Sequence, residues 1–325
     1  MQATALPFLR DQLLDRRQKL DIAARSPYGT AEASRLLREV DAALQRMTAG
    51  TFGLCEVCGD PIEADRLAAD PLLKFCLDHL TPPEQRALER DLELAARIQR
   101  DLLPPPDLTL DGWEVAYHYE PAGPVSGDYC DVITAGGDLV HILLGDVAGK
   151  GVAAALLMSH LSALFRTLIA VGLPMTDLMQ RANRMFCEST QPSRYATLVC
   201  ARADASGHIE VSNAGHPPPL VVRASDVSRI EATGVPIGMF ASSHYPSHAI
   251  GLERGEALLL YSDGIIESRD GHNDEYGVDR LAAAAAAAAD SPPRDLIAAC
   301  LHDVAAFRGL SRQNDDVTMM AIRRT

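Results

Sequence analysis

The sequence lacks the features that mark exported, membrane-embedded or nucleic-acid-binding proteins. Its first residues, MQATALPFLRDQLLDRRQ, carry charges where a signal peptide needs an uninterrupted apolar segment. Its most apolar long stretch, residues 152–172, contains His160 and Arg166, which is typical of a buried core helix rather than a membrane span. A formal net charge of −14 disfavours contact with phosphate backbones or anionic membranes. We therefore expect a cytoplasmic protein that binds neither nucleic acid nor membrane.

A disulfide framework is not expected either, because three of the seven cysteines cluster in a pattern typical of a metal site. Two residues separate Cys55 from Cys58, and two separate Cys76 from His79. This spacing fits one tetrahedral zinc ion held by two tight knuckles. The alternative is buried free thiols beside a surface histidine. The other four cysteines lie in apolar or strand-like contexts and are expected to be small core residues.

The residues around this pattern, LLREVDAALQRMTAGTFGLCEVCGDPIEADRLAADPLLKFCLDHL, resemble the DksA/TraR zinc-finger family over residues 31–80. His79 stands where the family usually has a fourth cysteine, a substitution that zinc accepts. Members that enter the secondary channel of RNA polymerase carry acidic residues at the tip of a long helical hairpin. Here the predicted hairpin is short, and its turn, residues 25–30, has no acidic residue. We therefore expect a module for protein interaction or dimerisation.

A linker helix is predicted over residues 84–103, because prolines stand at its start and three more stop it at 104–106. A 4-3-4-3 spacing links Leu88, Leu92, Ala95, Gln99 and Leu102. The spacing indicates a short parallel coiled-coil seam, weakened by the polar Gln99, that would make the protein a homodimer. The alternative is a helix that packs on its own domain.

Four aspartates in the last two-thirds of the chain stand in short glycine-rich or acidic segments: Asp128 in SGDYCD, Asp146 in GDVAGKG, Asp263 in SDG and Asp315 in NDDVT. Three of them adjoin apolar or β-branched runs, so we place them at strand ends, where distant segments converge. Converging carboxylates repel at low dielectric, and divalent cations compensate that repulsion. Their neighbours Asp131 and Asp316 are the alternative ligands.

Five segments in this order, SGDYCD, GDVAGKG, NAGHPP, YSDG and DDVT, resemble the metal-dependent serine/threonine phosphatases of the PPM family, in the SpoIIE-like branch with RsbU-type regulators. The resemblance covers residues 113–322. It implies that Asp146 bridges two Mg²⁺ or Mn²⁺ ions and that the carbonyl of Val147 adds one oxygen. It further implies that Asp128 and Asp263 complete one ion, and Asp263 and Asp315 the other. By the same resemblance, the substrate is a phosphorylated anti-sigma-factor antagonist of the STAS type.

Two departures from related motifs limit these expectations. No arginine stands just before SGDYCD, where many PPM phosphatases outside this branch use one for phosphate. The segment GDVAGKG is not a P-loop, because its glycine spacing is too short and Gly151 follows Lys150. His216 of NAGHPP is predicted to shape a loop, and Lys150 either attracts phosphate or is a solvated surface lysine. The main alternative function is a catalytically weak scaffold whose zinc module binds a signalling or transcription partner.

The predicted fold class is α/β, with two packed, mainly antiparallel sheets flanked by helices and preceded by a helical hairpin with a small zinc finger. The predicted domains are the hairpin and finger at 1–80, the linker at 81–106 and the phosphatase domain at 107–325. Strands are expected at 114–120, 139–145, 196–203, 208–213, 219–222, 257–261 and 317–323. Helices are expected at 6–24, 31–47, 152–171, 175–189, 278–289 and 293–307.

Overall fold

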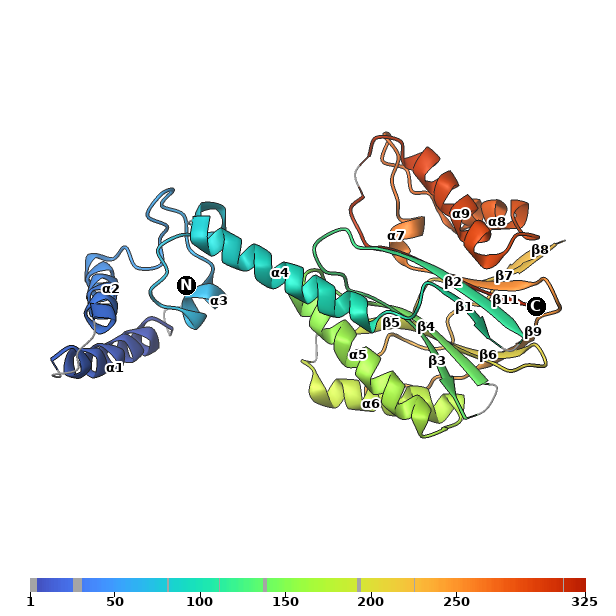
Figure 1. Ribbon diagram of the computed structural model, residues 1–325, viewed down its shortest axis with the longest axis horizontal. Helices are drawn as coiled ribbons and strands as arrows, with labels where there is room; N and C mark the ends of the chain where they lie inside the picture. Colours follow the sequence, from blue (N-terminus) through green and yellow to red (C-terminus); the bar gives the residue numbers. More distant parts are fainter. Residues whose placement is uncertain are drawn as a thin grey trace. The chain divides into compact units, whose positions relative to one another are not determined.

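The computed structural model of the protein describes residues 5–25, 31–80, 82–110, 112–136, 139–191, 194–224, 226–311 and 313–325. Contacts divide the chain into two compact units, Met1–Asp91 and Leu92–Thr325 (Figure 1). The fold of each unit follows from its own hydrophobic core.

The first unit contains the predicted hairpin and a short-helix region that carries the zinc-type pattern. Its helices are α1 (Ala5–Arg25), α2 (Ala31–Ala49), α3 (Ala64–Ala69) and the 3₁₀ turn η1 (Leu77–His79). The predicted turn at 25–30 lies outside the described residues from position 26 onward. Hairpin and finger share one small core, made of Leu9, Leu13, Val40, Ala43, Phe52, Cys55, Ile62, Leu67 and Cys76.

The second half of α4 (Pro82–Leu102) belongs to the second unit and packs on it through Gln99. Gln99 is only 4% exposed, its Nε2 donates to the carbonyl of Ser126 at 2.7 Å, and its Oε1 accepts from the N–H of Ser126 at 3.0 Å. The prediction that placed Gln99 in a seam between two chains is therefore wrong. Sequence spacing records which residues share a face of a helix, not which partner covers that face. A seam through Leu88 and Leu92 stays a prediction.

Replacing Gln99 with leucine should lower the free energy of unfolding of the second unit by about 1–3 kcal/mol, because buried polar groups of Ser126 lose their partners. Ser126 is fully buried, so water does not replace the amide. Denaturant unfolding followed by the fluorescence of Trp113, the single tryptophan, measures the change. Gln85→Leu is the matched control, since Gln85 hydrogen-bonds Glu89 on the exposed surface of the same helix. Equal stability of the two variants would contradict the anchoring role of Gln99.

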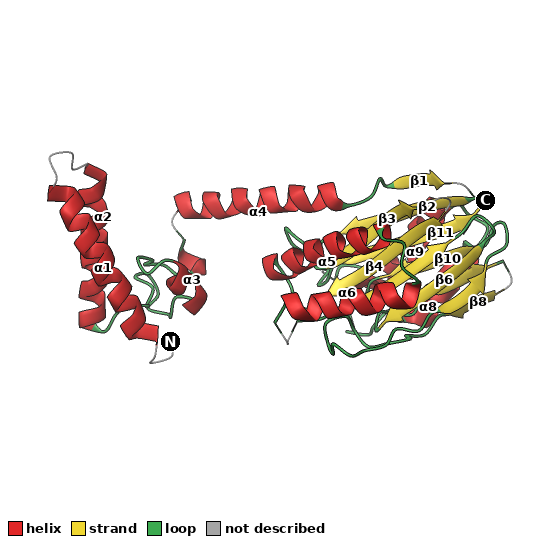
Figure 2. Cartoon of the chain, turned by 90° about the horizontal axis from the view of Figure 1, so that it is seen from below, coloured by secondary structure: helices red, strands yellow, loops and turns green. Residues whose placement is uncertain are grey.

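Two antiparallel sheets pack face to face in the second unit, as predicted (Figures 1 and 2). The six-stranded sheet has the order β1-β2-β11-β10-β7-β8, and the five-stranded sheet has the order β3-β4-β5-β6-β9. The strands are β1 (Asp107–Leu110), β2 (Trp113–Glu120), β3 (Asp128–Ala135), β4 (Leu139–Val147), β5 (Ala196–Ala203), β6 (His208–Ala214), β7 (Leu220–Arg223), β8 (Asp226–Arg229), β9 (His248–Gly251), β10 (Ala257–Tyr261) and β11 (Val317–Arg324).

Helices cover the outer face of each sheet, so the described part of this unit has four layers. Figure 1 shows α5 and α6 on the five-stranded sheet, and α8 and α9 on the six-stranded sheet. A separate core fills the space between the sheets, with Trp113, Ile142, Leu144, Val199 and Leu258 among its members. The helices are α5 (Val152–Ala170), α6 (Met175–Ser189), α7 (Asp263–Ile266), α8 (Val278–Ala287) and α9 (Pro293–Arg308).

Helix α5 is long and apolar enough to cross a membrane, by length and composition alone. In the structure it packs on β3 and β4 and next to α6. Residues such as Met158, Leu161 and Phe165 are buried in the core between this helix pair and the sheet. One face of α5 therefore packs within the domain, while Val152 and Leu156 are exposed.

Candidate metal centre

Two of the four aspartates are direct neighbours across a pair of strands. Asp128 is the first residue of β3, Asp146 lies one residue before the end of β4, and the antiparallel register pairs them. Paired residues project to the same face of a sheet. That face is turned toward the other sheet, because Ile142 and Leu144, at alternate positions from Asp146, belong to the core between the sheets.

The other two aspartates come from the six-stranded sheet. Asp263 begins α7 shortly after β10 ends at Tyr261, and Asp315 precedes β11, which begins at Val317. β10 and β11 are antiparallel neighbours, so the end of one and the start of the other lie at the same edge of the sheet. A Cβ placed on Gly264 would lie 3.3 Å from the Cβ of Asp315. The start of α7, which carries Asp263, and the loop that carries Asp315 are therefore adjacent.

A threonine connects the two sheets at this point. The Oγ1 of Thr318, on β11, donates to the Oδ2 of Asp128 at 2.5 Å, and both residues are buried. Motif reasoning did not identify Thr318, although it ends the DDVT segment and alternates with Asp316 along the strand. The structure thus brings Asp128 and Asp146 from one sheet together with Asp263 and Asp315 from the other.

Burial and mutual repulsion raise the pKa values of three carboxyl groups of the cluster, those of Asp128, Asp146 and Asp263. Desolvation, followed by the charge of Asp146, raises the pKa of Asp128 well above its usual range. Desolvation, Asp263 and Asp315 raise the pKa of Asp146 to about 8, and Lys150 opposes only part of this rise. Burial and Asp315 likewise raise the pKa of Asp263. Carboxylates gathered in this way need positive charge, and the all-oxygen donor set fits hard divalent cations.

Asp131, one of the alternative ligands, points away from the cluster. It lies on the opposite face of β3, where the Nε and Nη2 of Arg166 donate to its two oxygens, each at 2.8 Å. The hydroxyl of Tyr129 donates to the same carboxylate at 3.2 Å. Because Asp131 is fully buried and paired with Arg166 of α5, it anchors that helix to the sheet.

Asp316, the other alternative, holds the loop that precedes β3. Its Oδ1 accepts from the N–H of Ala122 at 2.7 Å. Its Oδ2 accepts from the hydroxyl of Ser126 at 2.7 Å and from the N–H of Gly127 at 2.9 Å. Both oxygens are therefore committed to shaping the loop from which Asp128 follows.

Asp315 and Lys150 line a pocket of about 130 Å³ beside the cluster, together with Arg269 and Arg308. The Nζ of Lys150 donates to the Oδ2 of Asp315 at 2.9 Å and to the carbonyl of Asn314 at 2.8 Å. The side chain of Asp315 is 43% exposed, so a ligand can reach it. Lys150 is exposed, as the surface-lysine alternative expected, and its ammonium already pairs with a carboxylate of the cluster.

His216 is a buried connector between the sheets, in agreement with its predicted role in shaping a loop. Its Nε2 lies 3.1 Å from the carbonyl of Tyr261 and its Nδ1 lies 2.8 Å from the hydroxyl of Thr197. A carbonyl only accepts, so Nε2 carries the proton and Nδ1 accepts from Thr197. Burial lowers the pKa of His216 to about 3, which keeps the imidazole neutral.

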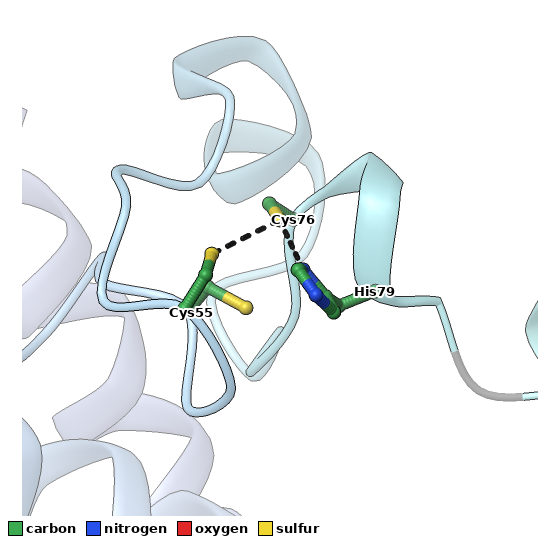
Figure 3. A group of neighbouring side chains, drawn as sticks. Cys55, Cys76 and His79 are labelled. Atoms are coloured by element: carbon green, nitrogen blue, oxygen red, sulfur yellow. Dashed lines mark hydrogen bonds between the residues drawn. The ribbon is translucent and has the colours of Figure 1, made fainter.

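The zinc-type residues meet in the first unit, as the spacing predicted. The ligand atoms of Cys55, Cys58, Cys76 and His79 all lie within 4.8 Å of one another. The Sγ of Cys76 is 3.7 Å from that of Cys58. It is 3.3 Å from the Nδ1 of His79, and Figure 3 shows Cys55, Cys76 and His79 gathered at one point. Gly59, whose φ of 78° suits glycine, closes the first knuckle by donating to the carbonyl of Cys55 at 2.9 Å. Three thiols and one imidazole are a suitable tetrahedral zinc set.

Replacing Gly264 with alanine should greatly weaken the binding of Mn²⁺ by the aspartate cluster, while the zinc-type unit stays folded. A Cβ at this position would lie 2.0 Å from the carbonyl oxygen of Asp316, so the 263–266 helix and the 315–316 loop must separate. We expect a loss of about 1–3 kcal/mol in unfolding free energy from this overpacking. Mn²⁺ titration and thermal unfolding measure both effects. Gly271→Ala, where an added Cβ meets nothing within 4 Å, is the control, and identical behaviour of the two variants would contradict the argument.

Similar solved structures include a PP2C domain and a structure of RsbU and RsbW domains. The SiaA-PP2C domain of Pseudomonas aeruginosa is 22% identical and aligns with 76% of this chain and 100% of that chain, with a TM-score of 0.68. The structure of the RsbU and RsbW domains of Rv1364c from Mycobacterium tuberculosis is 31% identical and aligns with 68% of this chain and 61% of that chain, with a TM-score of 0.60. The fold is therefore that of the PP2C phosphatases.

The chain belongs to the SpoIIE family, because residues 136–325, more than half of its length, match the family described as Stage II sporulation protein E. Residues 50–78 match the prokaryotic dksA/traR C4-type zinc finger. These matches confirm both resemblances drawn from the motifs. The match to the finger ends before His79, the one non-cysteine member of the pattern.

Curated relatives include two phosphatases of Bacillus subtilis. Phosphoserine phosphatase RsbP is 31% identical over 185 residues, which cover 55% of this chain and 46% of that protein. Phosphoserine phosphatase RsbU is 27% identical over 188 residues, covering 57% of this chain and 56% of that protein. Protein IcfG of Synechocystis is 27% identical over 263 residues, which cover 72% of this chain and 41% of that protein. The chain thus spans about half the length of the curated relatives that it matches.

Proposed function

We propose that this protein is a metal-dependent phosphatase that hydrolyses phosphoserine or phosphothreonine in a signalling protein. The observation that carries the proposal is the cluster itself: Asp128 and Asp146 paired across two strands, with Asp263 and Asp315 supplied by the facing sheet. Its mutually repelling carboxylates fit divalent cations. Membership of the SpoIIE family and the PP2C fold support the same activity.

We assign the two Mn²⁺ or Mg²⁺ ions to four aspartates and one carbonyl. Asp146 would be shared between both ions, with the carbonyl of Val147 as a further donor. Asp128 and Asp263 would complete one site, and Asp263 and Asp315 the other. When bound, such ions neutralise charge on the phosphoryl oxygens and activate water for attack. We prefer Asp128 and Asp315 over Asp131 and Asp316, since Arg166 pairs with Asp131 and the 122–127 loop occupies both oxygens of Asp316.

Turnover of a phosphoserine peptide by the purified full chain tests this proposal. We expect hydrolysis in Mn²⁺ or Mg²⁺, loss of hydrolysis in EDTA, and recovery when the metal is restored. Full activity after verified metal removal would contradict the two-ion site. No turnover in either metal would instead favour the catalytically weak scaffold.

The substrate and the regulation of the enzyme form the finer part of the proposal. Two of the relatives are named phosphoserine phosphatases, and we propose a phosphorylated anti-sigma-factor antagonist of the STAS type as the substrate. The Cys55, Cys58, Cys76 and His79 set would hold one structural zinc in a cytoplasmic protein. We further propose that the zinc-finger module regulates the enzyme and that α4 joins two copies of the chain through a seam that includes Leu88 and Leu92.

A further inference from the structure

The guanidinium of Arg194 lies over the loop that follows Asp146. A Cβ placed on Gly149 would be 3.5 Å from the Nη1 of Arg194. The N–H of Ala148 donates to the carbonyl of Tyr195 at 2.9 Å, so residues 148–149 and 194–195 run side by side. Arg194 is thereby held beside the loop that begins two residues after Asp146.

Arg194 differs from the other cations near the cluster because its side chain has no polar partner in the described part of the chain. Its half-buried guanidinium makes no hydrogen bond or ion pair with any residue that the structure describes. By contrast, Lys150 pairs with Asp315, Arg166 with Asp131, and Arg269 with Glu275. A guanidinium that is partly removed from water gains most from an anionic ligand with several acceptor oxygens.

We propose that Arg194 binds the phosphoryl group of the substrate, supplying the cation that the segment before SGDYCD lacks. This inference rests on the proposed function, since the phosphate is placed by the same cluster. The planar guanidinium offers two parallel N–H donors to phosphoryl oxygens, which a lysine does not reproduce. Because the net charge of the chain is −14, a phosphoprotein approaches against repulsion unless a local cation offsets it.

An exposed apolar loop beside Arg194 provides the surface for the peptide around the phosphoserine. Tyr195, Met239 and Phe240 are 38%, 37% and 59% exposed. The buried amide of Asn183 holds this loop, accepting from the N–H of Gly238 at 2.9 Å and donating to the carbonyl of Phe240 at 2.9 Å. The apolar side chains are therefore presented on a fixed backbone. This surface fits a substrate segment with apolar residues next to the phosphorylated serine.

The first test measures phosphate binding directly, by calorimetry with inorganic phosphate and the Mn²⁺-loaded full chain. We expect Arg194→Ala to weaken phosphate binding by about ten- to a hundred-fold, and Arg194→Lys to restore part of the loss. The Mn²⁺ affinity and the unfolding temperature should stay unchanged, since the guanidinium has no structural partner. Arg181→Ala, an exposed arginine of α6, is the control. Equal phosphate affinity of Arg194→Ala and wild type would overturn the assignment.

The second test separates phosphate from peptide recognition by turnover. Arg194→Ala should lower kcat/KM for both p-nitrophenyl phosphate and a phosphoserine peptide flanked by leucines. Phe240→Ala should raise KM for that peptide by about three-fold or more and leave p-nitrophenyl phosphate unaffected, because the small substrate has no peptide chain. A Phe240→Ala effect on both substrates, or on neither, would contradict the docking surface.

The two tests also distinguish this inference from the proposed function. If the wild type hydrolyses neither substrate but binds phosphate through Arg194, the phosphatase proposal fails and the phosphate site stands. If the wild type is active and Arg194→Ala matches it in rate and phosphate affinity, only the present inference fails.

Discussion

Replacing Asp146 with asparagine should lower the metal-dependent rate by about a thousand-fold while the second unit stays folded. Asp146 is proposed to bridge both ions, so one substitution weakens both sites, and the reaction loses the charge that they provide. Rates with a phosphoserine peptide across a Mn²⁺ titration measure the effect. Asp270→Asn is the matched control, because Asp270 accepts the N–H groups of His272 and Asp274 in an exposed turn away from the cluster.

The same variant should be at least as stable as the wild type without metal. The native environment raises the pKa of Asp146 from 3.8 to about 8. A carboxyl with a raised native pKa destabilises the fold progressively as pH rises through that interval, since the unfolded chain releases the proton first. Asparagine has no proton to release. We therefore expect Asp146→Asn to unfold at an equal or higher temperature in EDTA at pH 8. A large loss of stability there would show that its inactivity reflects misfolding.

Removing zinc should unfold the first unit and leave the aspartate cluster of the second unit able to bind Mn²⁺. The first unit has a small core, and two of the proposed ligands, Cys55 and Cys76, are part of it. Structural zinc contributes about 10–16 kcal/mol of apparent binding free energy, which is comparable with the whole stability of a small domain. Hydrogen exchange of peptides from residues 31–80, with and without chelator, reports the unfolding.

Cys58→Ser is the most informative variant for this prediction, because Cys58 is exposed and its loss removes no core packing. It should lose zinc and protection in the finger but keep phosphatase activity of the second unit. Cys187→Ser, a half-buried cysteine outside the finger, should keep zinc. Elemental analysis that finds no zinc in wild-type protein purified without chelator would overturn the assignment of this site.

Strands that the sequence patterns predict and strands that they do not predict occupy different positions in the sheets. All seven predicted strands are present within two residues of their expected ends, and they are β2, β4, β5, β6, β7, β10 and β11. The four strands that were missed, β1, β3, β8 and β9, are the four edges of the two sheets. An edge strand is paired on one side only, and edge strands are often short or carry polar residues that discourage further pairing. Their sequences therefore show a weaker apolar signal.

Chemistry that is local along the chain can be predicted from the residues and their spacing. Cys55 and Cys58 share one knuckle, Cys76 and His79 share another, and short spacing alone brings such pairs into reach of one ion. The glycine-aspartate segments were equally recognisable, because their residue types mark a cation site before any fold is known. The order of these segments along the chain then indicates the family.

Which side of each element faces the site follows from the packing of the folded chain and not from the sequence pattern. β3 is buried on both faces, so no apolar alternation showed that Asp128 turns inward between the sheets while Asp131 turns to Arg166. Gln99 likewise looked like a seam residue until Ser126 covered it. The phosphate-binding role inferred for Arg194 depends on its place beside Gly149, which precedes it by 45 residues in the chain. Contacts of this kind depend on packing between distant segments, which spacing along one chain does not record.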